Sequence, residues 1–548
     1  MSIQFTLHGI DWAIIIGYLA LVVAIGMYFG MRVKSSGEFF MANKRLPWFV
    51  CALSYMTVLI SAQDIVSYSQ TAYERGFVGG MMYLDDIGIV FLFLAIGLPI
   101  YYLSGVYSIP EYMEHRFGKS TRIACSVAVL LFMLALMSFN VYSIAVLMNN
   151  MFGWDILLIM MLCSAVCAVY TASGGVMSVM ITDTLQAALI FIGGGAMVYM
   201  SVKNAGGLST MMANLPTAHR SWLTPLMDPD YPALGMFLGG TLVLGFAWYF
   251  AHQSNLQKIL AARTLNQARL VTLIFAFVLM PIGVLFTGFP GVVYRSLVEQ
   301  GLAVAPSSTA VTFLYLVNTI AAPGILGFVL AFVLASMLST GAGYISSCTT
   351  VFVSDIYEKW RPGKSDKHYL TVSRITAIVI AIVIPYLFAQ YFMKFDALMT
   401  ALISMTSATM PGMVLVIMMG MLGKKLNNKA ATFTVWVSLG YVGLELFIPD
   451  IFLKPFCFGL YGTPGCSWFT AFGGLVAAIV AVIIGMLIWP KRDKKDEEYF
   501  GLVYTAQKSE TLENMYWRAV SQGKKGYIEL SAAERAEIAR DPSAPAIK

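Results

Sequence analysis

From Ser336 to Asp355 the chain reads SMLSTGAGYISSCTTVFVSD, a run of Ser, Thr and Gly inside a long apolar segment. Polar side chains at membrane depth are costly unless they bind something or face other helices, so this helix is not expected to face lipid. Ser336, Ser339 and Thr340 follow the spacing i, i+3, i+4, which places them on one face of a helix. Two interpretations stay open from spacing alone: half of a cation site, or small residues that let helices pack closely.

The composition around this stretch is that of an integral membrane protein. Of the 548 residues, 58% are hydrophobic and 12% are charged, which excludes an ordinary soluble domain. The net charge of +6 is spread over many short loops and offers no basic domain for nucleic acid. The five histidines and seven cysteines show no catalytic or metal-binding spacing, so an enzyme is not expected. Cys457 and Cys466 are the two cysteines placed to pair in a loop.

Apolar stretches of spanning length predict thirteen transmembrane helices, the first of them retained rather than cleaved as a signal. They cover residues 10–31, 47–73, 79–104, 121–150, 154–172, 178–203, 233–252, 269–291, 309–356, 370–392, 396–422, 430–452 and 468–489.

The loop charges predict the orientation in the membrane. Five loops on one side carry 17 Lys and Arg residues, whereas the loops on the other side carry six. Positively charged loops stay in the cytoplasm, so we expect the N-terminus outside and the C-terminus inside, in a multi-pass protein of the plasma or inner membrane. The basic loops are residues 32–46, 105–122, 253–269, 357–370 and 423–429.

Two predicted spans are interrupted in a way that a simple helix bundle does not require. The second span contains many polar residues, among them Gln63 and Asp64, and the seventh contains Gly239, Gly240 and Gly245. They are five spans apart, the interval expected when two five-helix repeats each begin with a broken helix at a central site. This pattern favours a secondary transporter. The predicted division is 1–46 (extra helix and first loop), 47–203 (first repeat), 204–232 (outer loop), 233–422 (second repeat), 423–490 (two further helices) and 491–548 (cytoplasmic tail).

Several motifs, in order and at their spacing, resemble the sodium/solute symporter family over about residues 10–490. Those in the first half are Leu59-Ile-Ser-Ala62, Ala72-Tyr73-x-x-Gly76, Tyr107-Ser-Ile-Pro-Glu-Tyr112, Arg116-Phe117, Tyr170-Thr-x-x-Gly-Gly175 and Thr182-Asp183-x-x-Gln186. Those in the second half are Gln253-x-x-x-Gln257-Lys258, Leu260-Ala-Ala-Arg263, Leu338-Ser-Thr340 and Ser354-Asp355-Ile-Tyr357. The resemblance implies an all-α LeuT-type inverted repeat of 5+5 helices, with one extra N-terminal and two extra C-terminal helices.

The resemblance also implies a sodium site. Carried over by position, its ligands are the main-chain oxygens of Thr57, Ile60 and Ser336 and the hydroxyls of Ser339 and Thr340. The face found from spacing and the family's sodium ligands therefore coincide, and Na+ is the expected coupling ion.

Asp183, in the Thr-Asp motif, is an ionisable residue inside a span. Such residues are costly and therefore functional by default. Two functional roles are open, a ligand of a second sodium ion or a group on the sodium release path. The structural alternative is an aspartate at the inward end of the span that caps a helix or pairs with a loop Arg.

The solute site departs from the sugar-carrying members of the family, which place Gln, Glu, Ser and Asn where this chain has Asp64, Tyr83, Asp86 and Gly245. A hexose-binding set is therefore not visible. The expected solute-binding residues are Gln63, Asp64, Tyr83, Asp86, Trp248, Ser404 and Thr406.

The resulting hypothesis is sodium-coupled symport of a small organic solute, such as an amino acid, sugar or monocarboxylate, by alternating access. Asp64 or Asp86 is expected to face the central cavity and to disfavour anionic solutes, which favours a neutral, zwitterionic or amine-bearing solute over a sugar. The alternative hypothesis is a membrane receptor that senses sodium or solute and retains the transporter fold.

Overall fold

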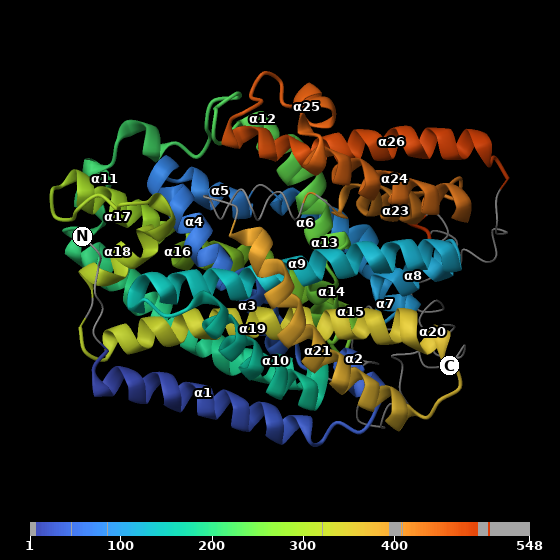
Figure 1. The fold of residues 1–548 in the computed structure, drawn as a ribbon, viewed down its shortest axis with the longest axis horizontal. Helices are drawn as coiled ribbons and strands as arrows, with labels where there is room; N and C mark the ends of the chain where they lie inside the picture. The colour runs from blue at the N-terminus through green and yellow to red at the C-terminus, as the bar shows by residue number, and fades with distance from the viewer. Residues whose placement is uncertain are drawn as a thin grey trace.

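The computed structural model describes residues 7–44, 46–84, 86–320, 322–393, 407, 409–491 and 502–504. Regular structure within these ranges is helical, and the pairing of Leu46 with Ala262 is an isolated bridge. Figure 1 shows the helices running mainly along the long axis of the molecule. The main helices are α1 (Gly9–Gly30), α3 (Trp48–Leu59), α4 (Ala62–Arg75), α6 (Ile87–Leu92), α7 (Leu98–Ser104), α9 (Lys119–Phe152), α10 (Ile156–Asn204), α13 (Phe246–Phe250), α15 (Leu265–Ile274), α16 (Met280–Thr287), α17 (Phe289–Glu299), α19 (Ile325–Thr350), α21 (Asp366–Phe392), α23 (Pro411–Leu422), α24 (Asn428–Phe447) and α26 (Thr470–Ile488).

Shorter helices fill the connections. They are α2 (Ser36–Met41), α5 (Val78–Leu84), α8 (Ile109–Arg116), α11 (Gly207–Asn214), α12 (Ala233–Gly235), α14 (Gln253–Leu260), α18 (Thr312–Thr319), α20 (Glu358–Trp360) and α25 (Pro449–Phe452), with the π-helical turns η2 (Phe93–Gly97), η4 (Met236–Gly245), η5 (Phe275–Leu279) and η7 (Val351–Tyr357).

The described residues contain nine helices long and apolar enough to cross a membrane, or up to eleven when each of two bent pairs counts as one span. The fold is therefore an all-α membrane-spanning bundle, as predicted. The count of thirteen stays a prediction, for two reasons. Part of the expected span 396–422 lies outside the described residues, and α10 alone covers two expected spans.

Within α10 the chain changes direction at a single glycine. Gly175 has φ 54° and ψ −142°, a backbone conformation in which residues with a Cβ are strained. A Cβ there would also approach the Phe39 carbonyl oxygen to 2.3 Å. One glycine thus separates the two predicted spans without any intervening loop, which hydropathy alone does not distinguish from a continuous helix.

The second span is broken as predicted, between α3 and α4, with a bend of 54°. α3 ends at Leu59, and Ile60 leaves the helical region with φ −97° and ψ 75°. Ser61 then starts α4 as its N-cap: its Oγ accepts from Asp64 N at 3.2 Å, and Ser61 N donates to Asp64 Oδ2 at 3.2 Å. This reciprocal pair is a capping box, which favours a new helix start at this position.

The seventh span was predicted to be broken, but in the structure it is continuous. Gly239, Gly240 and Gly245 lie in η4, and the helix continues through α13 to Phe250. The glycines instead permit close packing, because a Cβ on Gly239 would approach the Trp468 carbonyl oxygen to 1.9 Å.

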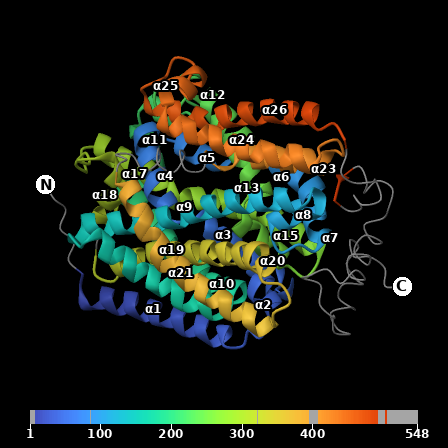
Figure 2. The same cartoon turned by 45° about the vertical axis from the view of Figure 1, so that its right-hand side comes forward.

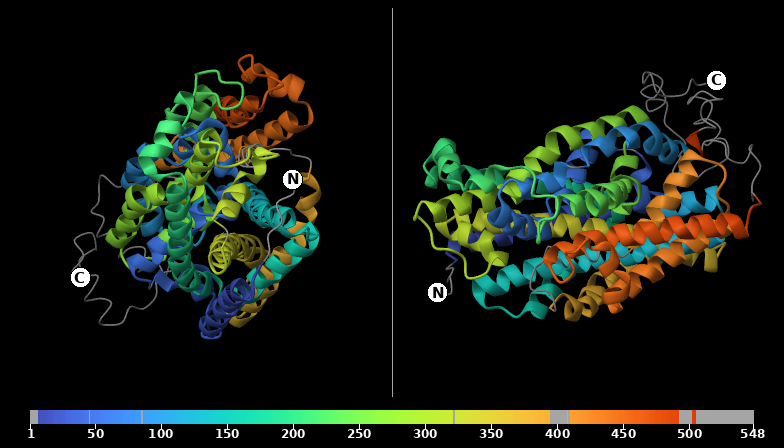
Figure 3. Two further views of the ribbon diagram at one scale, coloured as in Figure 1. Left: turned by 90° about the vertical axis from the view of Figure 1, so that its left-hand side faces the viewer. Right: turned by 90° about the horizontal axis from the view of Figure 1, so that it is seen from above.

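α19 lies at the centre of the bundle and carries the polar stretch 336–355. It packs against α10, α9, α1 and α21, an arrangement that Figure 2 shows from a second side. In the left panel of Figure 3 the bundle is viewed along its length, and α19 is seen nearly end-on among its neighbours. Ser336, Ser339 and Thr340 are fully buried, so this face of the helix contacts protein and not lipid.

The five basic loops lie together at one end of the bundle. Ser36 N donates to Asp366 at 3.1 Å, Gln257 Nε2 to the Phe40 carbonyl at 3.2 Å, and Gln253 Nε2 to the Tyr107 carbonyl at 2.9 Å. The hydroxyl of Thr121 donates to Asn428 at 2.7 Å. Each contact joins two of these loops, so the described parts of all five basic loops share one side of the molecule. α11, α17 and α18 lie at the opposite end (Figure 1).

Candidate functional site

The break between α3 and α4 exposes a main-chain oxygen toward α19. In a continuous helix Thr57 O would accept from Ser61 N, but the capping box already engages that N–H. The Thr57 carbonyl instead accepts a hydrogen bond from Thr340 Oγ1 at 2.9 Å. The carbonyls at a helix C-terminus carry partial negative charge, so this break suits a cation.

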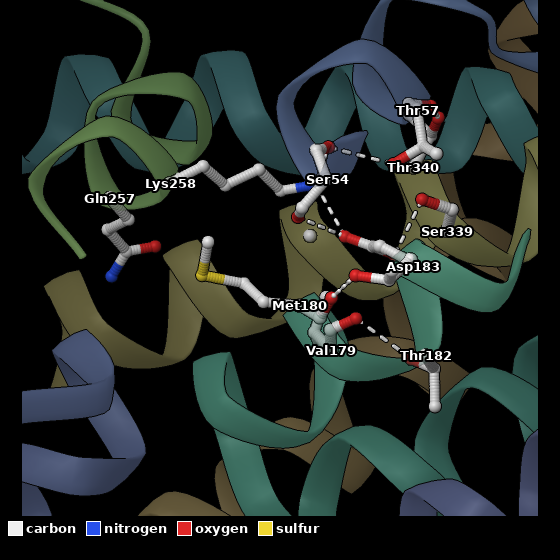
Figure 4. A network of polar contacts seen from close by, with 12 residues as sticks. Ser54, Thr57, Val179, Met180, Thr182, Asp183, Gln257, Lys258, Ser339 and Thr340 are labelled. Carbon is white, nitrogen blue, oxygen red and sulfur yellow. Dashed lines mark hydrogen bonds and ion pairs between the residues drawn. The ribbon is translucent and has the colours of Figure 1, made fainter. Parts of the chain in front are cut away.

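Ser339, next to Thr340 on α19, faces a buried carboxylate. Its Oγ donates to Asp183 Oδ1 at 2.6 Å, while Ser54 Oγ of α3 donates to Asp183 Oδ2 at 2.5 Å. The ammonium of Lys258 on α14 completes the cluster at 2.8 Å from Asp183 Oδ2. Figure 4 shows these side chains converging from α3, α10, α14 and α19. Hydroxyls, a carbonyl and a carboxylate therefore form one oxygen-rich centre in the bundle.

The other two predicted sodium ligands lie beside this centre. Ile60 is the residue at which α3 ends, and it is fully buried. Ser336 lies one turn before Thr340, with its hydroxyl bonded to the Phe332 carbonyl of the same helix at 2.9 Å. Its side chain is thus engaged within the helix, in keeping with a role that was predicted for its main-chain oxygen.

A second group of buried polar side chains lies between α3, α13, α14 and α19. The ring centroids of Trp248 and His252 are 4.7 Å apart, and those of His252 and Tyr344 are 5.8 Å apart. His252 Nδ1 accepts from Asn255 N at 3.3 Å, so Nε2 carries the proton. Nε2 and the Tyr344 hydroxyl make no hydrogen bond among the described residues. The Tyr55 hydroxyl faces Trp248, but the two make no hydrogen bond of ordinary geometry. Buried polar groups are normally paired, so this group marks a place for a polar ligand or water.

The predicted solute residues of α4 divide into two roles. Asp64 closes the capping box with Ser61, so its burial has a structural explanation. Gln63 Oε1 is buried without a partner among the described residues and remains available to a ligand.

Asp86 lies at the start of α6, beside the seventh span. A Cβ built on Gly245 would lie 2.9 Å from the Asp86 Cβ, so glycine is needed for this approach. Tyr83 lies on α5. The predicted residues Ser404 and Thr406 lie outside the described residues.

Comparison with known proteins decides the family. The sequence model of the Sodium:solute symporter family matches residues 39–438, most of the chain. The chain belongs to this family. It is a sodium-coupled symporter and not an enzyme.

Curated relatives match this symporter over most of both chains at low identity. The chain is 25% identical over 502 residues to the sodium/glucose cotransporter 4 of Danio rerio, covering 85% of this chain and 74% of the relative. It is 25% identical over 473 residues to the sodium/glucose cotransporter of Vibrio parahaemolyticus, covering 82% and 87%. It is 24% identical over 532 residues to the sodium/myo-inositol cotransporter of Homo sapiens, covering 86% and 73%.

Among solved structures, the symporter resembles one described as the substrate-bound outward-open state of a Na+-coupled sialic acid symporter that reveals a novel Na+ site. The TM-score is 0.76 at 21% identity, covering 89% of this chain and 99% of that one. The shared fold is the LeuT-type fold that the sequence resemblance implied.

At the basic end of the symporter an ionic cluster joins α8 and the start of α9 to η7. Arg122 pairs with Glu114 and with Asp355, and Ser108 Oγ donates to Asp355 Oδ1 at 2.9 Å. Burial raises the pKa of Glu114, but Arg122 and Lys359 outweigh this effect and hold it below its ordinary value of 4.5. Glu114 is therefore ionised at neutral pH, and the cluster ties the two predicted repeats together at this end.

Sequence reasoning missed four residues of these sites: Lys258, His252, Tyr344 and Tyr55. The stretch around Lys258 was expected to be a loop at the basic end, whereas α14 is a buried polar helix that His252 caps. A Lys and a His between apolar spans were the available signal, since ionisable residues at depth are functional by default.

Proposed function

We propose that this chain couples one or more sodium ions at the α3–α4 break to the uptake of a small polar solute bound between α3, α13, α14 and α19. The sodium ligands in this proposal are the main-chain oxygens of Thr57, Ile60 and Ser336 and the hydroxyls of Ser339 and Thr340. The observation that carries it is the contact of Thr340 Oγ1 with the Thr57 carbonyl across the break.

The coupling follows from where this contact lies. A cation between the end of α3 and α19 ties a helix of the first repeat (47–203) to a helix of the second (233–422). Its binding therefore favours the conformation in which these helices are close, and its release permits them to separate. A ligand shifts such an equilibrium only by its differential affinity for the two conformations, which a bridging ion provides.

The solute class follows from the polar groups near the break. Tyr344, Trp248 and His252 offer a hydroxyl, an indole N–H and an imidazole N–H as donors to oxygen atoms, and Gln63 supplies an acceptor. Such a set of donors and acceptors suits an uncharged solute with several hydroxyl groups. Asp64 is engaged in the capping box, which leaves fewer carboxylates for an amine-bearing solute. The names of the relatives, sodium/glucose and sodium/myo-inositol cotransporters, support a sugar or cyclitol as the first class to test.

Uptake into proteoliposomes tests this proposal. Radiolabelled glucose, myo-inositol, proline, lactate and choline are offered with an inward sodium gradient or with potassium instead. We expect accumulation of a neutral polyhydroxylated solute in sodium only. Accumulation of lactate but not of the neutral solutes would contradict the proposed class. Solute binding that is indifferent to the cation would favour the sensor.

We also propose that the basic end of the bundle is cytoplasmic and that the protein resides in the plasma or inner membrane. The five loops that meet at that end carry 17 of the basic residues in the sequence, which supports this orientation. The cluster of Arg122, Glu114 and Asp355 would then close the cytoplasmic side and open when solute is released.

A further inference from the structure

The carboxylate of Asp183 already has a cation beside it. The Lys258 ammonium donates to Asp183 Oδ2 and to the Ser54 main-chain oxygen, both at 2.8 Å. Both charged side chains are buried, with Lys258 3% and Asp183 0% exposed. An ion pair this deep in the bundle is costly to form and costly to break, so it is a fixed feature of this conformation.

The oxygen atoms around Lys258 Nζ would equally suit a small cation. Asp183 contributes a carboxylate, Ser54 a carbonyl and a hydroxyl, and Ser339 a hydroxyl bonded to the same carboxylate. Hard monovalent and divalent cations prefer such oxygen ligands. The Lys258 ammonium therefore occupies a position that a second sodium ion would otherwise find favourable.

This position adjoins the proposed sodium site. The Ser54 carbonyl accepts from Lys258 Nζ and also from Thr57 Oγ1 at 2.8 Å, and Ser339 and Thr340 are consecutive on α19. Two cation positions thus lie next to each other, one held by oxygen atoms alone and one filled by a side chain of the protein. A sodium ion entering beside Asp183 would be repelled by the ammonium while Lys258 stays in place.

We propose that Lys258 is a built-in cation that takes the place of a second sodium ion at Asp183, so that this symporter binds one sodium ion in each cycle. The inference rests on the proposed sodium site at Thr57, Ser339 and Thr340. Lys258 is then a residue that sets the stoichiometry of coupling without binding the solute.

A small cavity beside Lys258 makes the inference testable by substitution. It has a volume of ≈ 10 Å³, the space of about one water, and Met180, Gln257 and Gly343 contribute to its lining. The Lys258→Met substitution keeps most of the stem of the side chain and removes Nζ. It leaves Asp183, Ser54 and Ser339 facing an open position next to this cavity.

The experiment counts sodium ions bound to the purified, full-length protein by isothermal titration with NaCl, with choline chloride holding ionic strength constant. We expect one site in the wild type, two in Lys258→Met, and one in Lys258→Arg, which restores the tethered charge. The double variant Lys258→Met, Asp183→Asn should return to one site, since it removes the carboxylate. Lys203→Met, an exposed lysine at the end of α10, is the matched control and should keep one site.

Two sites in the wild type would overturn the inference, as would one site in a folded Lys258→Met variant. If Lys258→Met does not fold, Thr340→Ala decides in its place. With Lys258 present, removing the Thr340 hydroxyl should weaken sodium binding at the single site at least tenfold and reveal no second sodium site. A sodium site of unchanged affinity that persists in Thr340→Ala and vanishes in Asp183→Asn would place sodium at Asp183 and overturn the inference. A wild type that binds no sodium would instead overturn the proposed sodium site itself.

Discussion

At the residue scale, the hydroxyls of Ser339 and Thr340 are the groups whose removal tests the sodium site most directly. Thr340→Ala takes away one proposed ligand and adds no clash. The loss of one such contact is worth roughly 1–1.5 kcal/mol, so we expect the sodium concentration for half-maximal uptake to rise about tenfold. Ser339→Ala should act in the same direction. Solute affinity at saturating sodium should change much less, because the two ligands are linked through sodium occupancy.

Ser336→Ala is the matched control for these variants. The Ser336 hydroxyl bonds the Phe332 carbonyl of its own helix, and its proposed ligand is the main-chain oxygen, which alanine retains. Sodium dependence of uptake in Ser336→Ala should therefore stay close to that of the wild type. An unchanged sodium dependence in the double variant Ser339→Ala, Thr340→Ala would show that these hydroxyls only pack helices.

A second residue-scale prediction concerns the unpaired hydroxyl of Tyr344. Tyr344→Phe removes a buried group that has no partner among the described residues, so the thermal stability of the protein should be unchanged or slightly higher. If the hydroxyl contacts solute, the KM for the solute should rise about tenfold, the worth of one hydrogen bond. Scintillation-based uptake and thermal melting in detergent measure the two effects.

Tyr170→Phe provides the opposite control. Its hydroxyl donates to the Leu338 carbonyl at 2.6 Å, so its loss should lower thermal stability with little effect on the KM for solute. A KM for solute that stays at the wild-type value in Tyr344→Phe would remove Tyr344 from the proposed solute site.

Part of the candidate sodium site could be predicted from the sequence. The common face of Ser336, Ser339 and Thr340 follows from helical spacing, and their burial against α3 and α10 agrees with it. The pairing of Asp183 with Lys258 joins residues 75 positions apart on different helices. Only packing brings them together, so the sequence suggested a loop Arg as one alternative partner of Asp183 and did not point to Lys258.

At the scale of elements, the capping box of α4 creates the break that the proposed sodium site needs. Ser61→Ala and Asp64→Ala should each destabilise the protein by about 1 kcal/mol, the usual worth of a helix cap. Because the two residues bond reciprocally, the double variant should cost less than the sum of the single variants. Thermal melting in detergent of the four proteins measures this difference, and strictly additive losses would contradict the reciprocal pair.

The same variants should weaken sodium binding. With Asp64 gone, Ser61 N is free to bond the Thr57 carbonyl, which would extend α3 and compete with the cation for that oxygen. The effect on the sodium concentration for half-maximal uptake should be smaller in Asp64→Asn, whose side-chain oxygen still accepts from Ser61 N.

Element boundaries show why part of the fold escaped prediction from sequence. The broken second span was predictable, because polar residues inside an apolar run require an explanation. The continuous course of the seventh span through η4 was not predictable, because glycines serve equally for unwinding and for close packing. The approach of the Trp468 backbone to Gly239 decides between these two roles. The local sequence pattern predicts a loop where the structure has α14. The polar residues of α14 are buried by neighbouring helices, which a local pattern does not reveal.

At the scale of the whole molecule, the proposed sodium site and the ionic cluster of Arg122, Glu114 and Asp355 hold the two repeats together at different depths. The proposed sodium site joins the repeats through an exchangeable ion, whereas the cluster joins them through charged side chains of the protein. Sodium can therefore bias the packing of α3 against α19 while the cluster keeps the basic end closed. Under the proposed orientation, we expect release to the cytoplasm to require both connections to open.

That account depends on the basic end facing the cytoplasm, which predicts the accessibility of exposed loops. Val304 lies in the loop between α17 and α18 and is 78% exposed, while Ser365 is an exposed residue of the basic loop before α21. In intact cells a membrane-impermeant maleimide should label Val304→Cys and not Ser365→Cys, and both should react once the membrane is permeabilised. Labelling of Ser365→Cys alone in intact cells would reverse the orientation.

Cys457 and Cys466 form a disulfide at the other, less basic side, which agrees with an oxidising exterior. Mass spectrometry of protein isolated without reductant should therefore find this pair oxidised, and both as free thiols would contradict the outward placement of that loop.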